Sequence, residues 1–231
     1  MIDSPGFDLL KGRLSKVESL FLIMDVRAGN AVPDLSKLAN LRHLVLFVAD
    51  DKGPGVIDVK PLAKLTQLKA LTVFADGCKN AGAIGSLVNL QFLTMAWKSP
   101  GDLSILKRLP NLRHLAAQFP ADADFSFVEK TPNLQTLSIM NMDETQNLKP
   151  LEKLRRLRCL AVSRENNAKV FRIEDFKNVM EFQKARPDVE VVECQGMCLG
   201  SFWLLPLAAA AAVAAWLIRR RWVGDRLACQ R

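Results

Sequence analysis

At 231 residues the chain is of single-domain size. Five Arg and one Asp follow Leu199, so the 32 basic and 24 acidic residues leave a net charge of only +4 before that position. Nucleic-acid binders concentrate basic residues on one face. Reading along the chain we find no such stripe, so we assign these charges to solvated turns and exclude nucleic acid as a partner.

Seven leucines mark a repeated unit. Each stands where a run of apolar residues spaced three apart changes to a spacing of two, which predicts a helical or coiled segment followed by a short strand. Successive members are 24, 27, 22, 22, 22 and 23 residues apart. These anchor leucines are Leu20, Leu44, Leu71, Leu93, Leu115, Leu137 and Leu160.

A second pattern has the same register. Asp or Asn stands thirteen residues before each of five successive anchors. Both residue types favour the start of a helix or turn, because the side-chain oxygen accepts hydrogen bonds from free backbone N–H groups. These residues are Asp58, Asn80, Asp102, Asp124 and Asn147. One apolar position in the three-residue spacing is occupied by Thr131.

With these repeats the chain resembles a leucine-rich repeat protein of the short class, with about 22 residues per turn, over roughly residues 8–193. The resemblance implies an α/β fold: a right-handed solenoid with a parallel sheet on its concave face and short helices or turns on its convex face. The sequence lacks the asparagine that the family usually has three residues after the second strand position. In its place are Ala49, Asp76, Lys98, Pro120, Met142 and Glu165.

The turns are interrupted twice. Gly53, Pro54 and Gly55 predict a turn in the long loop between the second and third repeats. After the seventh repeat, an amphipathic pattern predicts a closing helix at about residues 173–185, with Lys184 and Arg186 at its end. A last strand at Val189, Val191 and Val192 completes a solenoid of seven to eight turns over residues 1–193.

After a linker at residues 194–198, residues 199–218 contain no charged side chain and are followed by a basic tail at 219–231. Twenty helical residues span about 30 Å, the thickness of the hydrocarbon layer. We therefore predict a single transmembrane helix. The anchor residues are the interfacial Trp203 and Trp216 and the basic Arg219, Arg220 and Arg221.

The positive-inside rule places the tail in the cytoplasm and the repeats outside. The first residues have neither the basic start nor the apolar core of a secretory signal. A C-terminal anchor without a signal would instead leave the repeats in the cytosol. Cys194 and Cys198 are compatible with either side, as a disulfide outside or as lipidated or free thiols inside.

The residues that flank the anchors are expected on the concave face, where partners of leucine-rich repeat proteins commonly bind. Its N-terminal half is apolar and aromatic, which marks a site for a protein or peptide unless the rings are covered by each other or by a missing region. The candidate binding residues are Phe21, His43, Val45, Phe47, Thr72, Phe74, Phe92, Thr94 and His114.

No catalytic or metal-binding constellation is recognisable. His43 and His114 fall in one column three turns apart, or roughly 14 Å at the strand spacing of about 4.8 Å, so they cannot share a metal ion. Cys78, Cys159 and Cys229 have no metal-ligand spacing. We expect no enzyme activity, no cofactor and no small-molecule substrate.

These observations predict a non-catalytic, membrane-anchored module that binds a protein or peptide on the concave face. One alternative is a cytosol-facing, tail-anchored regulatory scaffold that recruits an enzyme to a membrane. Another is a fragment of a larger surface receptor or adhesin.

Overall fold

A computed structural model of the chain describes residues 14–25, 31–50, 53–97, 103–123, 125–163 and 172–193. The chain divides into two compact units, Met1–Met197 and Cys198–Arg231. All described residues belong to the first unit. The predicted linker, transmembrane helix and basic tail, including Cys194 and Cys198, lie outside the described residues.

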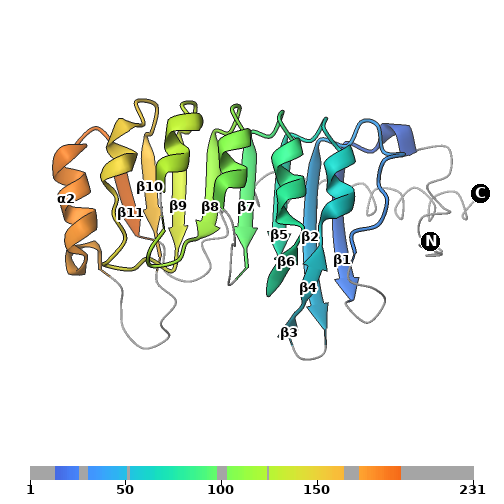
Figure 1. Cartoon of the computed structure of the whole chain (residues 1–231), viewed down its shortest axis with the longest axis horizontal. Helices are drawn as coiled ribbons and strands as arrows, with labels where there is room; N and C mark the ends of the chain where they lie inside the picture. The colour runs from blue at the N-terminus through green and yellow to red at the C-terminus, as the bar shows by residue number, and fades with distance from the viewer. Residues whose placement is uncertain are drawn as a thin grey trace, which may run out of the picture. The chain divides into compact units, whose positions relative to one another are not determined.

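The described residues form a leucine-rich repeat solenoid with a parallel sheet on one side and short helices on the other (Figure 1). Strands adjacent in this sheet also follow one another along the chain, with one rung per repeat. The rungs are β1 (Ser19–Asp25), β2 (His43–Asp50), β5 (Ala70–Phe74), β7 (Phe92–Ala96), β8 (His114–Gln118), β9 (Thr136–Met140), β10 (Cys159–Val162) and β11 (Glu190–Glu193).

The predicted register is confirmed. Leu20 pairs with Leu44, Leu44 with Leu71, and the pairing continues through every anchor leucine to Leu160, which pairs with Val191 of the last rung. The anchors of β2 through β10 are at most 2 % exposed, so they form the core between the sheet and the helices.

The three-residue spacing produces 3-10 helices rather than α-helices, because side chains at i and i+3 eclipse in a helix with three residues per turn. The N–H groups of Leu65 and Leu68 donate to the carbonyls of Leu62 and Leu65, at 2.8 and 2.9 Å. Each leucine thus bonds to the leucine three residues before it and faces the same core. These helices are η1 (Leu14–Lys16), η3 (Lys60–Lys64), η4 (Ala81–Ser86), η5 (Leu103–Arg108), η6 (Phe125–Lys130), η7 (Lys149–Lys153) and η8 (Ile173–Asp175).

The predicted turn initiators are confirmed only in part. Asp58 and Asn147 accept backbone hydrogen bonds from the residues two positions later, at 2.9 and 3.1 Å. Asn80 does not, because it has a left-handed backbone (φ 57°) and its side chain instead donates to Asp58 at 2.9 Å. Asp102 and Asp124 lie outside the described residues. Thr131 is fully buried at its apolar position, and its hydroxyl donates to the Phe127 carbonyl at 3.4 Å.

A polar ladder unforeseen from the sequence joins the repeats. An amide side chain four residues before each of five anchors donates to a backbone carbonyl of the preceding repeat, at 3.2 Å or less. Because these donors recur at one position, they give a turn carbonyl of each preceding repeat a side-chain hydrogen bond and join neighbouring repeats in the same way. The ladder consists of Asn40, Gln67, Asn89, Asn111 and Asn133.

The missing family asparagine is replaced by varied hydrogen bonds. The Gln146 side chain, 1 % exposed, donates to the carbonyls of Phe119 and Pro120 at 3.1 and 3.0 Å. The Met142 N–H donates to the Ser163 carbonyl at 2.7 Å. The turns after the strands therefore differ from one another, as expected without the regular asparagine.

The long loop after β2 forms more structure than predicted. Residues Gly53–Pro54 (β3) turn back and pair antiparallel with the end of β2. Residues Val56–Asp58 (β4) then pair in parallel with Gly77–Lys79 (β6) to form a second, two-stranded sheet. These strands were missed because two or three residues are too few to show a hydrophobic period.

The closing helix is shorter than the predicted 173–185. Phe176 has an extended backbone (φ −112°, ψ 99°) that separates η8 from the α-helix α2 (Lys177–Ala185). Phe176 itself is buried at 1 % exposure, which gives a packing reason for the break. Val189 also precedes the last strand instead of opening it, because β11 begins at Glu190.

Candidate functional site

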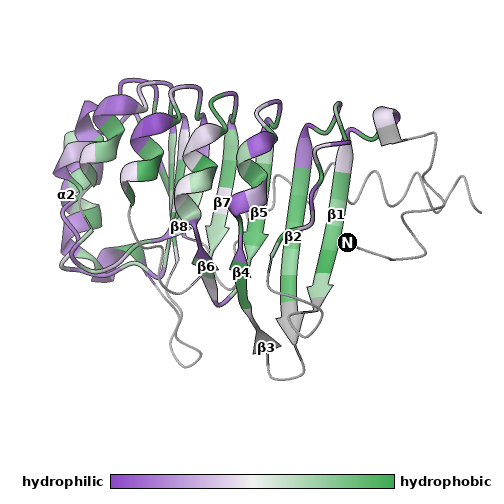
Figure 2. Ribbon diagram, turned by 45° about the vertical axis from the view of Figure 1, so that its right-hand side comes forward, coloured by the Kyte–Doolittle hydropathy of each residue, from purple (hydrophilic) through white to green (hydrophobic). Residues whose placement is uncertain are grey.

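We call the face of the sheet that points away from the 3-10 helices the outer face. It carries the strand residues one before, one after and three after each anchor. Strand register places the nine predicted binding residues in three columns across β1, β2, β5, β7 and β8 (Figures 1 and 2). His43, Phe92 and His114 belong to the first column. Phe21, Val45, Thr72 and Thr94 form the second, and Phe47 and Phe74 pair in the third.

The size and exposure of the apolar side chains on the outer face decrease along the sheet. At its N-terminal end, Phe21, Ile23 and Phe47 are 53 %, 68 % and 41 % exposed. On β8 and β9 the outward residues Ala116 and Ser138 are small and only 7 % exposed. Figure 2 shows β1 and β2 in hydrophobic colours along most of their described length. The apolar surface available to a partner is therefore concentrated on the first strands.

The aromatic rings partly cover one another, which the sequence left open. Phe47 and Phe74 are in tilted contact, with centroids 6.0 Å apart, yet Phe47 remains substantially exposed. Phe92 stacks on His114 with centroids 4.4 Å apart and planes 7° from parallel. We call Phe21, Ile23, Phe47 and Phe74 the apolar patch.

The two histidines have different surroundings. His43 is exposed, and its Nδ1 lies 3.0 Å from the Ser19 hydroxyl. His114 is half-buried against Phe92, and burial, with a smaller contribution from the charge of Arg113, lowers its pKa. Two other strands, β5 and β7, separate the histidines in the sheet, so they share no site.

The described cysteines are structural in character. Cys78 and Cys159 are free thiols. Burial, aided by the nearby Asp58 charge, raises the pKa of Cys78 to about 12, and burial together with Glu190 raises that of Cys159. Both thiols therefore stay protonated near neutral pH and are poor nucleophiles. Within the described ranges no group of three or more His, Cys, Asp or Glu side chains could hold a metal ion.

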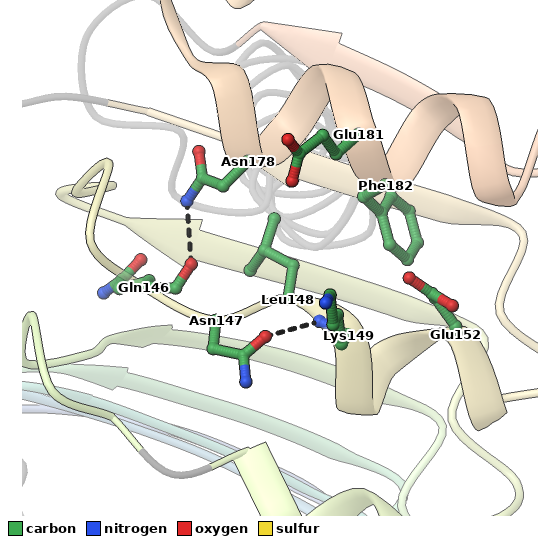
Figure 3. A pocket seen from close by; sticks show the side chains of 8 residues that line it. All are labelled: Gln146, Asn147, Leu148, Lys149, Glu152, Asn178, Glu181 and Phe182. Atoms are coloured by element: carbon green, nitrogen blue, oxygen red, sulfur yellow. Dashed lines mark hydrogen bonds between the residues drawn. The ribbon is translucent and has the colours of Figure 1, made fainter.

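A small pocket of about 220 Å³ lies between η7 and α2 (Figure 3). Asn178 from α2 reaches across it and donates to the Gln146 carbonyl at 2.9 Å, and the Asn147 side chain accepts from the Lys149 backbone at 3.1 Å. The Asn178 hydrogen bond attaches the closing helix to the last repeats, whereas the Asn147 bond is local to the start of η7. The lining residues are Gln146, Asn147, Leu148, Lys149, Glu152, Asn178, Glu181 and Phe182.

A basic stripe that we did not find by reading along the chain becomes visible when the repeats are aligned. It follows the short loops that lead from the 3-10 helices into the strands, along the top of Figure 1. We define these six strand-start loops as residues 37–42, 64–69, 86–91, 108–113, 130–135 and 153–158. They contain eleven Lys and Arg residues and no Asp or Glu. The stripe was missed because the charges recur once per repeat and never form a run in sequence.

No protein-family model matches the sequence, and no curated protein matches it either. Solved structures with a similar fold include an internalin from Listeria monocytogenes, at 16 % identity and a TM-score of 0.47, over 80 % of this chain and 58 % of that one. A leucine-rich repeat protein from Leptospira interrogans matches at 14 % identity and a TM-score of 0.47, over 80 % of this chain and 50 % of that one. The chain thus matches about half of the length of these two proteins. TLR13 in its complex with ssRNA13 matches less well, at 18 % identity and a TM-score of 0.32, over 54 % of this chain and 26 % of that one.

Proposed function

We propose that this chain is a membrane-anchored recognition module that binds a protein or peptide on the outer face of its first strands. The observation that carries this proposal is the apolar patch, in which three side chains of neighbouring strands are at least 41 % exposed. Contiguous exposed apolar surface of this kind typically marks a protein interaction site. Polar or ionisable neighbours such as Thr72 and His43 would supply directional contacts at its border.

The apolar patch can be tested without disturbing the core. We expect the double variant Phe47→Ser with Phe74→Ser to lose partner binding, because both rings belong to the outer face and neither is an anchor residue. The first step is to identify and purify a protein that the immobilised wild-type chain retains and the variant does not. The Kd of this purified protein is then measured for both chains. Thr136→Ser with Gln118→Ser, also outward positions but on β9 and β8, is the matched control. Equal affinity of the purified partner for wild type and double variant would refute binding at the patch.

The membrane anchor rests on the sequence of residues 199–218. None of the helices in the described part of the chain is long and apolar enough to span a bilayer. The proposed span is bounded by Trp203 and Trp216 and followed by Arg219, Arg220 and Arg221, which favour the interface and the cytoplasmic side. The full chain should stay with membranes in alkaline carbonate, whereas a chain ending at residue 198 should be released.

Sidedness separates this module from a cytosolic scaffold that recruits an enzyme. If the repeats are outside, protease added to intact cells removes them and leaves the tail protected. Protected repeats with an accessible tail would instead place the solenoid in the cytosol. The oxidation state of Cys194 and Cys198 provides a second readout of the same question.

A further inference from the structure

The strand-start loops carry a second surface, which we call the basic ridge. In most loops a basic residue stands seven residues before the anchor leucine, and in most a second one stands two residues before it. Residues of the ridge are exposed except Arg42, which is half-buried. The ridge consists of Lys37, Arg42, Lys64, Lys69, Arg108, Arg113, Lys130, Lys153, Arg155, Arg156 and Arg158.

The ridge is held in place by the repeat architecture. The strands that follow the loops are paired in register, and at a strand spacing of about 4.8 Å the five steps from the first loop to the sixth cover about 24 Å. The amide ladder lies within the first five of these loops and hydrogen-bonds each of the second to fifth loops to its predecessor, and Arg156 of the sixth loop donates to Asn133 of the fifth at 2.7 Å. The positive charges therefore form an ordered line rather than a set of independent side chains.

Most of the charge on the ridge is not neutralised. Lys64 pairs with Asp34 at 3.3 Å and Lys153 with Glu129 at 3.0 Å. Among the described residues, no carboxylate pairs with the remaining basic side chains of the ridge. Of the segments that follow the strands, those at residues 53–59, 119–123 and 141–147 contain acidic and no basic residues, and the one after β5 has one of each, Asp76 and Lys79. A partner for the ridge should therefore carry negative charge.

An apolar break in the ridge narrows the chemistry of that partner. The third loop has Ser86 and Gln91 at the two positions that are basic in most other loops, and between them Val88 is 45 % exposed. At the same position in the next two loops stand the exposed Pro110 and Pro132. A phosphate backbone has no apolar group to place against this strip, whereas an acidic protein segment with apolar side chains does.

The described chain ends at Glu193, the last residue of β11, on the strand-end edge of the sheet, opposite the ridge. The basic side chains of the ridge are therefore not those next to the end of the described chain. Phosphatidylserine vesicles distinguish lipid headgroups from a protein segment as the occupant.

We propose that the basic ridge binds an acidic, partly apolar segment of a partner protein, with its carboxylates against the Lys and Arg side chains and its apolar residues against Val88. This inference rests on the proposed function as a protein-recognition module and assigns that module a second contact. Because the amide ladder orders the ridge before binding, little conformational entropy of the loops is lost.

The test uses the full chain in a non-ionic detergent and a fluorescein-labelled peptide of Glu-Glu-Leu repeats, about twelve residues long, which when extended exceeds the ridge in length. We expect Lys69→Glu, Arg113→Glu and Lys130→Glu together to weaken peptide binding by about ten-fold or more at low salt. The matched control, Lys79→Glu, Lys149→Glu and Lys177→Glu, makes the same change in net charge at exposed positions outside the strand-start loops. It should weaken binding much less.

Four results would overturn the ridge proposal: no binding to the wild-type chain, equal loss in the control variant, equal or tighter binding of an oligothymidylate of the same charge, or comparable binding of phosphatidylserine vesicles. An all-glutamate peptide of equal length should bind more weakly than the leucine-containing one, and equal binding would remove the apolar contact. Phe47→Ser with Phe74→Ser should leave peptide binding intact. Failure of the apolar patch is thereby distinguished from failure of the ridge.

Discussion

The two ends of the described solenoid bury their apolar side chains to different extents. At the C-terminal end, Phe176, Val179 and Phe182 are buried beneath η8, α2 and β11. On β1, the inward-facing Leu20 and Leu22 are only partly buried. At the C-terminal end, the Arg186 and Asn178 side chains also donate to carbonyls of the last repeats. The comparison suggests that the closing end contributes stability, while the first strands supply surface for recognition.

Truncating one aromatic ring at each end tests whether the two ends contribute differently to stability. Phe182→Ala should lower the free energy of unfolding by roughly 3–5 kcal/mol, because it removes a ring that is 1 % exposed and leaves a cavity. Phe21→Ala, at a 53 % exposed position on β1, should change it by about 0.5 kcal/mol or less. Urea unfolding followed by circular dichroism measures both. Similar losses would show that β1 is as much a part of the core as α2.

A smaller effect is expected at the hydrogen bonds of the closing end. The Arg186 guanidinium donates to the carbonyls of Glu152, Leu154 and Leu157, at 3.1, 2.9 and 3.4 Å, and pairs with Asp188 at 2.8 Å. Its own pKa is raised, and that of Asp188 lowered, mainly by their mutual hydrogen bonds.

Arg186→Met keeps the apolar stem of this side chain but removes the guanidinium donor from three backbone carbonyls, of which that of Leu154 keeps the Leu157 N–H. It should cost roughly 2 kcal/mol in the free energy of unfolding. Lys184→Met, two residues earlier and exposed, is the control and should be nearly neutral. An Arg186 variant as stable as the control would mean that water replaces these hydrogen bonds without loss.

The repeat architecture was predictable because the same local spacing of apolar residues recurs at seven anchors. Leucines at three-residue spacing followed by a two-residue step determine which side chains face the core, so the register from Leu20 to Leu160 followed from the sequence. The short strands β4 and β6 were not predictable, because three residues contain less than two full alternations. The break at Phe176 depends on tertiary packing that no local pattern encodes.

The functional surfaces were predictable in part. The columns of the outer face followed from the register, but the exposure of Phe47 beside Phe74 depends on side-chain packing in three dimensions. The amide ladder and the basic ridge did have a sequence signal. Asn89, Asn111 and Asn133 each precede an anchor by four residues, and comparison by repeat position rather than by neighbouring residues would have revealed them. The apolar strip of Val88, Pro110 and Pro132 becomes apparent only when the loops are assembled side by side.

The smallest expected effect tests the boundary between the apolar patch and the buried middle of the outer face. Burial of His114 against Phe92, with Arg113 nearby, lowers its pKa below the usual value of 6.5. The unfolded chain then binds a proton at a higher pH than the folded chain does. Neutral His114 therefore contributes to the free energy of unfolding above about pH 6.5. This contribution is lost as the pH falls through that value toward the pKa of His114 in the folded chain.

His114→Phe preserves an aromatic ring beside Phe92 but has no group that titrates, so it should not lose stability in this way. The free energy of unfolding of the variant minus that of the wild type should therefore grow as the pH is lowered from 7.5 to below the folded pKa. Urea midpoints at a series of pH values measure the difference. A pH-independent difference for His114→Phe would show that its imidazole is as well solvated as a surface side chain, and that the recognition surface extends at least as far as β8.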